Sequence, residues 1–254
     1  MINKIVTPSA KLDLAKKTRN QLKWHNVVFI ISLLVFPILS YFAFQLKWVN
    51  SKPEFSNDIE APVAKLVVDG TVGTAFLVNS TTLLTARHMI MNKNIGDKVD
   101  LFFEKSKTQL QTTATIKFIT KTNVQVQAQG VPFEYFLTDF ALLSVPEITD
   151  IQPLNLGSSA NAKNLDEVIL VGYPQGDYSI TKGNINSDKY QGFNLFKLDA
   201  TANPGNSGGP CISKADNTVI GILVGGSGRF AQGENVAVKI DDVIKILKQA
   251  GIKF

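Results

Sequence analysis

Short apolar runs, which recur from about residue 61 onward, constrain the fold of this chain most. They are rich in Val, Ile, Leu, Phe and Thr and are bounded by turn-forming residues, as in TAFLVN at 74–79, KVDLFFE at 98–104 and EVILVGYP at 167–174. Many short strands at this spacing are typical of all-β sandwiches and barrels. Residues 146–166 lack such runs, so we expect them to join two halves of an all-β structure.

The C-terminal end has a different period. Ile240, Val243, Ile244 and Leu247 follow the spacing i, i+3, i+4, i+7, which predicts an amphipathic helix. Gly251 follows and is expected to end it. We therefore expect a C-terminal helix over 240–250 that packs against the last strands.

An uncharged run, VVFIISLLVFPILSYFAF, occupies residues 27–44. About 20 residues of helix cross a hydrocarbon core of about 30 Å. Trp24 and Trp48 flank the run, as interfacial aromatic residues do. We favour a single transmembrane helix at 27–46, preceded by a basic tail at 1–26 and followed by a polar linker at 47–60.

Two other interpretations of this run stay open. A cleaved signal peptide needs a short basic start and a small-residue cleavage site, whereas the preceding tail is long and no clear A-x-A pattern follows. A buried soluble helix rarely runs this far without a polar face. Six basic residues precede the run and only Lys47 and Lys52 follow it closely, so the positive-inside rule predicts a cytoplasmic N-terminus. The remaining domain would be extracytoplasmic, on the periplasmic side of a bacterium.

Charge and cysteine content narrow the possible partners. Residues 1–26 hold six basic residues against one acidic residue, while the rest of the 254-residue chain holds 20 of each. The basicity therefore belongs to the tail, and we expect no nucleic-acid partner. Cys211 is the only cysteine, so the chain has no internal disulfide. One Cys and two His cannot form a Cys/His zinc cluster, and we expect no metal and no cofactor.

A serine among glycines carries the chemistry. Ser207 lies in the sequence G-N-S-G-G-P at 205–210, which is how a chain exposes a hydroxyl and aims backbone N–H groups at the space before it. A serine nucleophile needs a base and a group that orients the base. His88 is the only histidine outside the N-terminal region, and Asp139 opens the apolar run DFALLSV. Each, taken alone, also fits an ordinary structural or turn residue.

Together these motifs resemble the chymotrypsin-like (trypsin-fold) serine proteases. The resemblance rests on T-A-R-H at 85–88, D-F-A-L-L at 139–143 and the serine motif, in the order His, Asp, Ser. It covers roughly residues 61–250. It implies two six-stranded antiparallel β-barrels, the first at about 61–145 and the second at about 166–239, with the C-terminal helix at 240–250.

The same resemblance implies roles for named residues. His88, Asp139 and Ser207 would be the catalytic triad of a serine endopeptidase that forms an acyl-enzyme, with Gly205 and Ser207 as the oxyanion hole. The specificity pocket would be set by Thr201 at its floor and by Val224, Gly225 and Gly226 at its wall. Because the floor carries no acid, we expect small or medium uncharged residues at the cleavage site rather than Lys or Arg.

Within this family the chain is most similar to the bacterial HtrA-type proteases. N-P-G-N-S-G-G-P at 203–210, V-G-Y-P at 171–174 and T-K-G-N-I at 181–185 carry that similarity. Three departures stand out. Only residues 251–254 follow the predicted helix, so we expect no PDZ domain. Arg87 replaces the usual small residue before the histidine. Asn206 replaces the aspartate that pairs with a new N-terminus in trypsin-like zymogens, so we expect no activation by N-terminal cleavage.

The favoured hypothesis is a membrane-anchored serine endopeptidase that acts on a protein or peptide substrate. Two alternatives remain: a catalytically silent pseudo-protease that serves as a binding or scaffold module, and a dedicated processing protease with one partner substrate. The sequence assigns no oligomeric state.

Overall fold

The structure is a computed structural model that describes residues 58–124, 132–226 and 234–253, together with Arg19, Trp24 and Val35. The chain divides into residues 1–54 and 55–254, and the fold belongs to the second part. Apart from Arg19, Trp24 and Val35, the predicted tail and membrane helix lie outside the described residues, as does most of the predicted linker. Within the described ranges, no helix is both long and apolar enough for a membrane crossing.

The first six strands form a closed antiparallel barrel in the order β1-β2-β3-β6-β5-β4. The strands are β1 (Val63–Val68), β2 (Thr71–Asn79), β3 (Thr82–Thr85), β4 (Lys98–Phe102), β5 (Gln111–Ile119) and β6 (Ala141–Ser144). Two short helices interrupt them, the 3-10 helix η1 (Arg87–Ile90) after β3 and α2 (Phe133–Phe136) before β6. Both therefore lie at the ends of strands that pair with each other.

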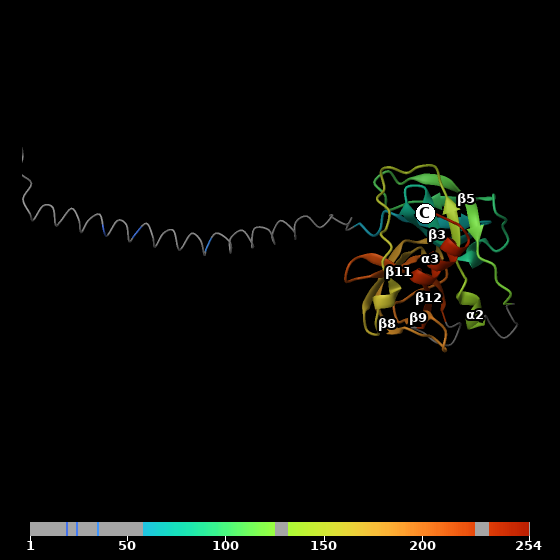
Figure 1. Cartoon of the computed structure of the whole chain (residues 1–254). Coiled ribbons are helices and arrows are strands. Elements are labelled where there is room, and N and C mark those ends of the chain that lie inside the picture. The colour runs from blue at the N-terminus through green and yellow to red at the C-terminus, as the bar shows by residue number, and fades with distance from the viewer. Residues whose placement is uncertain are drawn as a thin grey trace, which may run out of the picture. The chain divides into compact units, whose positions relative to one another are not determined.

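The second six strands close a second barrel in the order β10-β11-β12-β9-β8-β7 (Figure 1). They are β7 (Glu167–Gly172), β8 (Ser179–Ser187), β9 (Leu195–Leu198), β10 (Pro210–Ser213), β11 (Thr218–Gly226) and β12 (Asn235–Lys239). The 3-10 helices η2 (Ser159–Asn161) and η3 (Pro174–Gly176) flank β7. The predicted architecture of two six-stranded antiparallel barrels is confirmed.

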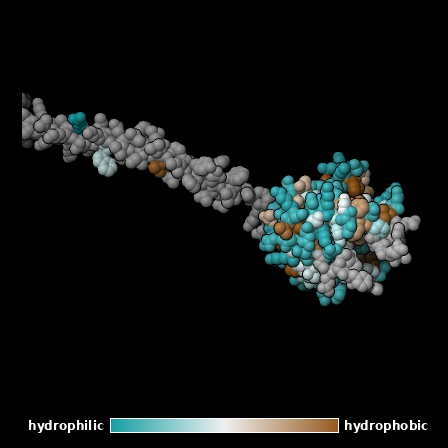
Figure 2. Space-filling view, turned by 90° about the horizontal axis from the view of Figure 1, so that it is seen from below, coloured by the Kyte–Doolittle hydropathy of each residue, from teal (hydrophilic) through white to brown (hydrophobic). Residues whose placement is uncertain are grey.

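Alternation along the strands divides the apolar side chains among three clusters. One fills the first barrel, one fills the second, and the third lies between them. In β6, Ala141 and Leu143 point into the first barrel while Leu142 joins the cluster between the barrels; in β12, Ala237 points into the second barrel. This follows from the two-residue period of a strand. The face of the domain in Figure 2 is mainly hydrophilic, as expected when apolar side chains supply these clusters.

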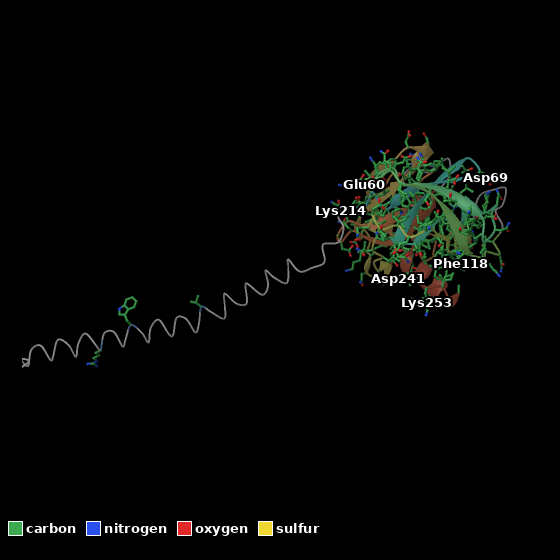
Figure 3. The ribbon with its side chains drawn as sticks, turned by 90° about the horizontal axis from the view of Figure 1, so that it is seen from above. Glu60, Asp69, Phe118, Lys214, Asp241 and Lys253 are labelled. Atoms are coloured by element: carbon green, nitrogen blue, oxygen red, sulfur yellow. The ribbon has the colours of Figure 1, made fainter. Side chains whose placement is uncertain are left out.

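The C-terminal helix α3 (Ile240–Gln249) packs as its pattern predicts, and its bounds lie within the predicted 240–250. Ile240, Val243 and Leu247 are buried in the cluster between the barrels. Asp241, labelled in Figure 3, accepts hydrogen bonds from the Ser158 and Ser159 hydroxyls, each at 3.0 Å. The segment that joins the barrels is therefore tied to the helix that ends the domain.

The run NVQVQAQ at 123–129 has the composition of a strand, but its two described residues, Asn123 and Val124, belong to none, and the rest lies outside the described residues. Two observed strands, β8 and β10, have sequences without a strong apolar run. The polar β8, SITKGNINS, is held by its pairing with β7 over six residue pairs.

Candidate active site

His88 lies in η1, directly after the strand β3 that delivers it. Its backbone N–H donates to Asp139 Oδ1 at 2.8 Å, and its Nδ1 lies 2.7 Å from Asp139 Oδ2. The side chain is 27% exposed, so the far edge of the ring, with Nε2, is left for other partners. The two contacts fix both the position of the backbone and the orientation of the imidazole.

Asp139 is fully buried and precedes β6 by two residues. Its backbone N–H donates to the Phe136 carbonyl at 3.2 Å, at the end of α2. Because an ionised carboxylate only accepts hydrogen bonds, the His88 Nδ1 must carry its proton on the side facing Asp139. This leaves Nε2 of neutral His88 as the proton acceptor.

The loop before Ser207 turns its N–H groups outward. Gly205 has a φ of 105°, and a Cβ there would lie 2.2 Å from the Tyr173 carbonyl oxygen, so only glycine fits. The Pro204 carbonyl accepts from the Gln175 N–H at 2.8 Å. Since the C=O and N–H of one peptide group point in opposite directions, this bond aims the Gly205 N–H away from Gln175.

The Ser207 N–H is oriented in the same way, by a hydrogen bond to the carbonyl that precedes it. The Asn206 carbonyl accepts from the Gly209 N–H at 2.9 Å, so the Ser207 N–H points away from Gly209. Within the described part of the chain, the hydrogen bonds include none donated by the Gly205 or Ser207 N–H groups. The loop thus holds two unused backbone donors, each fixed by the carbonyl that precedes it.

Thr74, on β2 of the first barrel, holds this loop of the second barrel. Its hydroxyl donates to the Gly205 carbonyl at 2.7 Å and accepts from the Tyr173 N–H at 3.1 Å. Its own N–H donates to the Ser207 carbonyl at 2.9 Å. No local sequence pattern singles out Thr74, because its hydroxyl contacts residues that are 99 and 131 positions away.

Gly208 brings the serine loop against the strand end that carries His88. It has a φ of 87°, and a Cβ there would lie 2.4 Å from the Thr85 hydroxyl and 2.7 Å from the Ala86 nitrogen. The half-buried Ser207 is thereby held beside this strand end. No hydrogen bond joins Ser207 to His88 among those of the described residues.

The predicted pocket residues lie on two segments that Asn235 connects. Thr201 is exposed, and its carbonyl accepts from the Thr181 hydroxyl at 2.8 Å. The buried Asn235, on β12, donates from Nδ2 to the neighbouring Ala200 carbonyl at 2.6 Å. Its Oδ1 lies 2.7 Å from where a Cβ on Gly226 would stand. Asn235 therefore links the predicted floor to the predicted wall, a role that its place in the apolar run NVAVK did not indicate.

The predicted wall at the end of β11 is covered by an aromatic ring. Val224 is buried, Gly225 is half-buried and Gly226 is exposed. The Phe136 ring of α2 lies 2.8 Å from where a Cβ on Gly225 would stand, so the ring uses the space that glycine leaves. Phe136 and Phe133 have their ring centroids 6.1 Å apart, and together they bring α2 against the second barrel.

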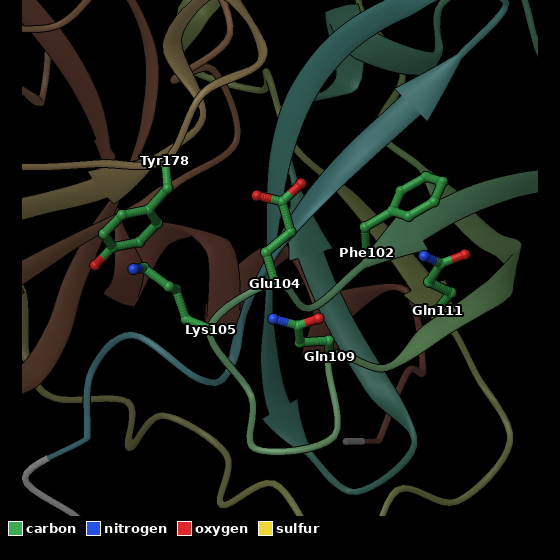
Figure 4. Close-up of a pocket in the computed structure, with 6 residues that line it drawn as sticks. All are labelled: Phe102, Glu104, Lys105, Gln109, Gln111 and Tyr178. Carbon is green, nitrogen blue, oxygen red and sulfur yellow. The ribbon is translucent and has the colours of Figure 1, made fainter.

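A separate pocket of about 420 Å³ lies away from these residues (Figure 4). It is lined by Phe102, Glu104, Lys105, Gln109, Gln111 and Tyr178. Lys105 lies 4.3 Å from the centroid of the Tyr178 ring, and the Tyr178 hydroxyl donates to Glu60 at 2.5 Å. Burial and the neighbouring Glu60 raise the pKa of Tyr178 above its usual range, so this hydroxyl stays protonated. None of the predicted site residues lines this pocket.

Comparisons with known proteins agree with this fold. Residues 73–222 match the family model of the trypsin-like peptidase domain. A probable periplasmic serine endoprotease, DegP-like, of Hahella chejuensis is 35% identical over 128 residues, which are 45% of this chain and 26% of that protein. A serine protease of Staphylococcus epidermidis, described as HtrA-like, is 31% identical over 178 residues, 63% of this chain and 30% of the relative. The chain thus spans less than a third of the length of the curated relatives that it matches.

Two solved structures share the fold. The inactive form of Rv3671c from M. tuberculosis superposes with a TM-score of 0.58 at 20% identity, covering 79% of this chain and 94% of the other. A variant of the HtrA-type protease AlgW with a tripeptide gives a TM-score of 0.59 at 21% identity, covering 75% and 60%. The predicted trypsin-like fold and the predicted similarity to HtrA-type proteases are confirmed.

Proposed function

Because this chain belongs to the trypsin-like peptidase domain family, we propose that it hydrolyses peptide bonds through a triad of His88, Asp139 and Ser207. The observation that carries the proposal is that the buried Asp139 carboxylate contacts both the backbone N–H and the Nδ1 of His88 at hydrogen-bond distance. A buried carboxylate costs free energy unless its oxygens are well used, and here both oxygens hold the same histidine. That arrangement is the one a general base requires.

The chemical steps follow from these positions. Ser207 Oγ attacks the carbonyl carbon of the scissile bond while its proton passes to His88 Nε2. The imidazolium then gives that proton to the leaving amine, so the peptide C–N bond breaks and an acyl-enzyme remains. A water molecule, deprotonated by His88, hydrolyses the ester and regenerates Ser207. Asp139 keeps its charge throughout and stabilises the imidazolium.

The Gly205 and Ser207 N–H groups would bind the oxyanion of both tetrahedral intermediates. Their orientation is fixed by the Gln175–Pro204 and Gly209–Asn206 hydrogen bonds, so little reorganisation is needed when charge develops. The bond between Ser207 and His88 would close when substrate binds, since catalytic hydrogen bonds often tighten only in the complex.

The substrate is a protein or peptide, with small or medium uncharged residues before the cleaved bond. Thr201 at the pocket floor supplies no charge to pair with Lys or Arg. The end of β11, where Gly225 is half-buried beside the Phe136 ring and Gly226 is exposed, is suited to pairing with an extended substrate backbone. Profiling with a peptide library tests this, and a preference for basic residues would contradict it.

We place the protease domain outside the cytoplasm, anchored by a helix at 27–46. Two observations support this proposal. The uncharged run follows a basic segment, and one relative is described as a probable periplasmic serine endoprotease, DegP-like. We also expect no zymogen activation, because Asn206 has no charge to pair with a new N-terminus. A nicked form that gained activity absent from the intact chain would contradict this.

A fluorophosphonate probe, which reacts with activated serines, tests the proposed function. The full chain in detergent, Ser207→Ala and His88→Ala are treated in parallel. We expect labelling of the wild-type chain alone. Labelling that survives Ser207→Ala would contradict the proposal, because another residue would then be the one that reacts. Absence of labelling in the folded wild-type chain would also contradict it and would favour a pseudo-protease. Digestion of casein then distinguishes a general endopeptidase from one dedicated to a single partner.

A further inference from the structure

Arg87 is a buried charge that the proposed reaction does not use. It is 4% exposed, although arginine is rarely buried without a partner. Within the described ranges, Arg87 and Asp139 are the only charged residues among the buried ones. The Arg87 Nε lies 3.9 Å from Asp139 Oδ1. These two buried charged side chains are thus neighbours.

The other contacts of the Arg87 guanidinium all reach the segment that leads into Asp139. Nη2 donates to the Tyr135 carbonyl at 3.4 Å and Nη1 to the Thr138 hydroxyl at 3.5 Å. The guanidinium carbon lies 4.3 Å from the centroid of the buried Tyr135 ring, where a cation is attracted by the face of the ring. One side chain therefore contacts residues 135, 138 and 139 together.

This segment needs to be held, because Asp139 lies on no strand. β5 ends at Ile119 and β6 begins at Ala141, so the carboxylate comes from a long connection. The Thr120 hydroxyl contacts the backbone on both sides of Asp139, at the Thr138 carbonyl and, at 2.6 Å, at the Phe140 carbonyl. Arg87 adds side-chain contacts to residues 135, 138 and 139 from the position adjacent to His88.

Building on the proposed triad, we propose that Arg87 is a positioning residue for the catalytic acid. It fastens the segment 135–139 to the strand end that carries His88, and its charge offsets part of the desolvation of Asp139. The His88–Asp139 hydrogen bond then has a fixed geometry before substrate arrives. A small side chain at position 87 would make none of these contacts to residues 135, 138 and 139.

The test uses the full chain in detergent with Arg87→Met, which keeps length and removes the charge, and Arg87→Lys, which keeps the charge and loses the fork. Lys65→Met is the control, because Lys65 also pairs with a carboxylate, that of Glu104, and lies 5.6 Å from the Phe102 ring centroid. Two readouts are taken: kcat and KM on a fluorogenic peptide, and the downfield proton resonance of the His88–Asp139 hydrogen bond. The resonance is measured in a Ser207→Ala background, so it does not depend on activity.

We expect Arg87→Met to lower kcat by about 10²-fold with KM nearly unchanged, since a small misplacement of a reacting group has that effect. The downfield resonance should broaden or disappear, Arg87→Lys should recover part of both, and Lys65→Met should resemble the wild-type chain.

A wild-type resonance in folded Arg87→Met, or a kcat that falls only with the folded fraction, would overturn the inference. If Arg87→Met does not fold, Arg87→Lys and Tyr135→Leu decide by the same readouts. If the wild-type chain is inactive, the proposed function fails, and the resonance still tests the positioning role.

Discussion

The Thr74 hydroxyl donates to the carbonyl of Gly205, 131 positions later, at a distance of 2.7 Å. This is a contact from the first barrel to the loop of the second barrel that carries the serine. Because the same hydroxyl also accepts from the Tyr173 N–H, one oxygen sets the spacing between the end of β7 and the serine loop.

We expect Thr74→Val to lower both activity and stability. The substitution keeps the shape and leaves a buried carbonyl and a buried N–H without partners, which costs about 1–3 kcal/mol each at most. Urea denaturation gives the free energy of unfolding, and peptide hydrolysis gives kcat. Ser106→Ala is the matched control, because its buried hydroxyl also donates to one backbone group and accepts from another. It should lose stability with kcat unchanged; an equal loss of kcat in both variants would argue against a specific role for Thr74.

Gly205→Ala should abolish most of the activity. A Cβ there would lie 2.2 Å from the Tyr173 carbonyl oxygen, so the loop must move and carry its N–H group out of place. Loss of one oxyanion donor lowers kcat by about 10²–10³-fold. Gly70→Ala is the control, since its φ is 80° but nothing lies within 4 Å of the new Cβ. It should show only the strain of a left-handed residue, about 1–2 kcal/mol, in thermal unfolding. Near-normal kcat in Gly205→Ala would contradict the assignment.

Asp139→Asn should lower kcat by about 10⁴-fold while KM and the fold are retained. The amide nitrogen would face His88 Nδ1 and stabilise the wrong tautomer of the imidazole. Asp241→Asn serves as the comparison, because Asp241 also accepts several hydrogen bonds but binds the segment 158–160. We expect it to reduce stability and to leave kcat unchanged. Hydrolysis of a fluorogenic peptide measures both, and a small loss in Asp139→Asn would exclude a triad role.

Cys211 should be unreactive in the native protein. It is a free, fully buried thiol, and burial raises its pKa to about 12. The unfolded chain loses this proton near pH 9, so between about pH 9 and 12 the native state binds more protons and stability falls as pH rises. Cys211 contributes about 1.4 kcal/mol per pH unit to this slope, and Cys211→Ala should remove that contribution. Thiol reagents should label the chain only in denaturant, and rapid native labelling would disprove the burial.

Much of this site was readable from the sequence because its chemistry is local. The serine loop needs glycine at positions 205 and 208, where φ is positive, and the motif G-N-S-G-G-P supplies glycine at both. Asp139 and His88 each mark a strand end. What could not be read depends on distant partners: Thr74 and Asn235 look like ordinary strand residues, and their roles come from residues about 35 to 131 positions away.

Arg87 and β8 also depend on distant partners and could not be predicted from local sequence. Arg87 had no explanation in the sequence, because its burial depends on α2, which itself has no strong helical period. The strand β8 alternates few apolar residues, and its pairing with β7 rather than its own propensity makes it a strand. The spacing of apolar residues predicts a helix or strand only when that element buries its side chains with the same period.

The cluster between the barrels has a consequence for how the candidate site is assembled. It takes side chains from β3 and β6 of the first barrel and from β11, β12 and α3. The Ser207 loop is fastened to both β2 and β11. Either barrel alone would therefore hold only part of the site, and separation of the two barrels should dismantle it even if each barrel kept its own core.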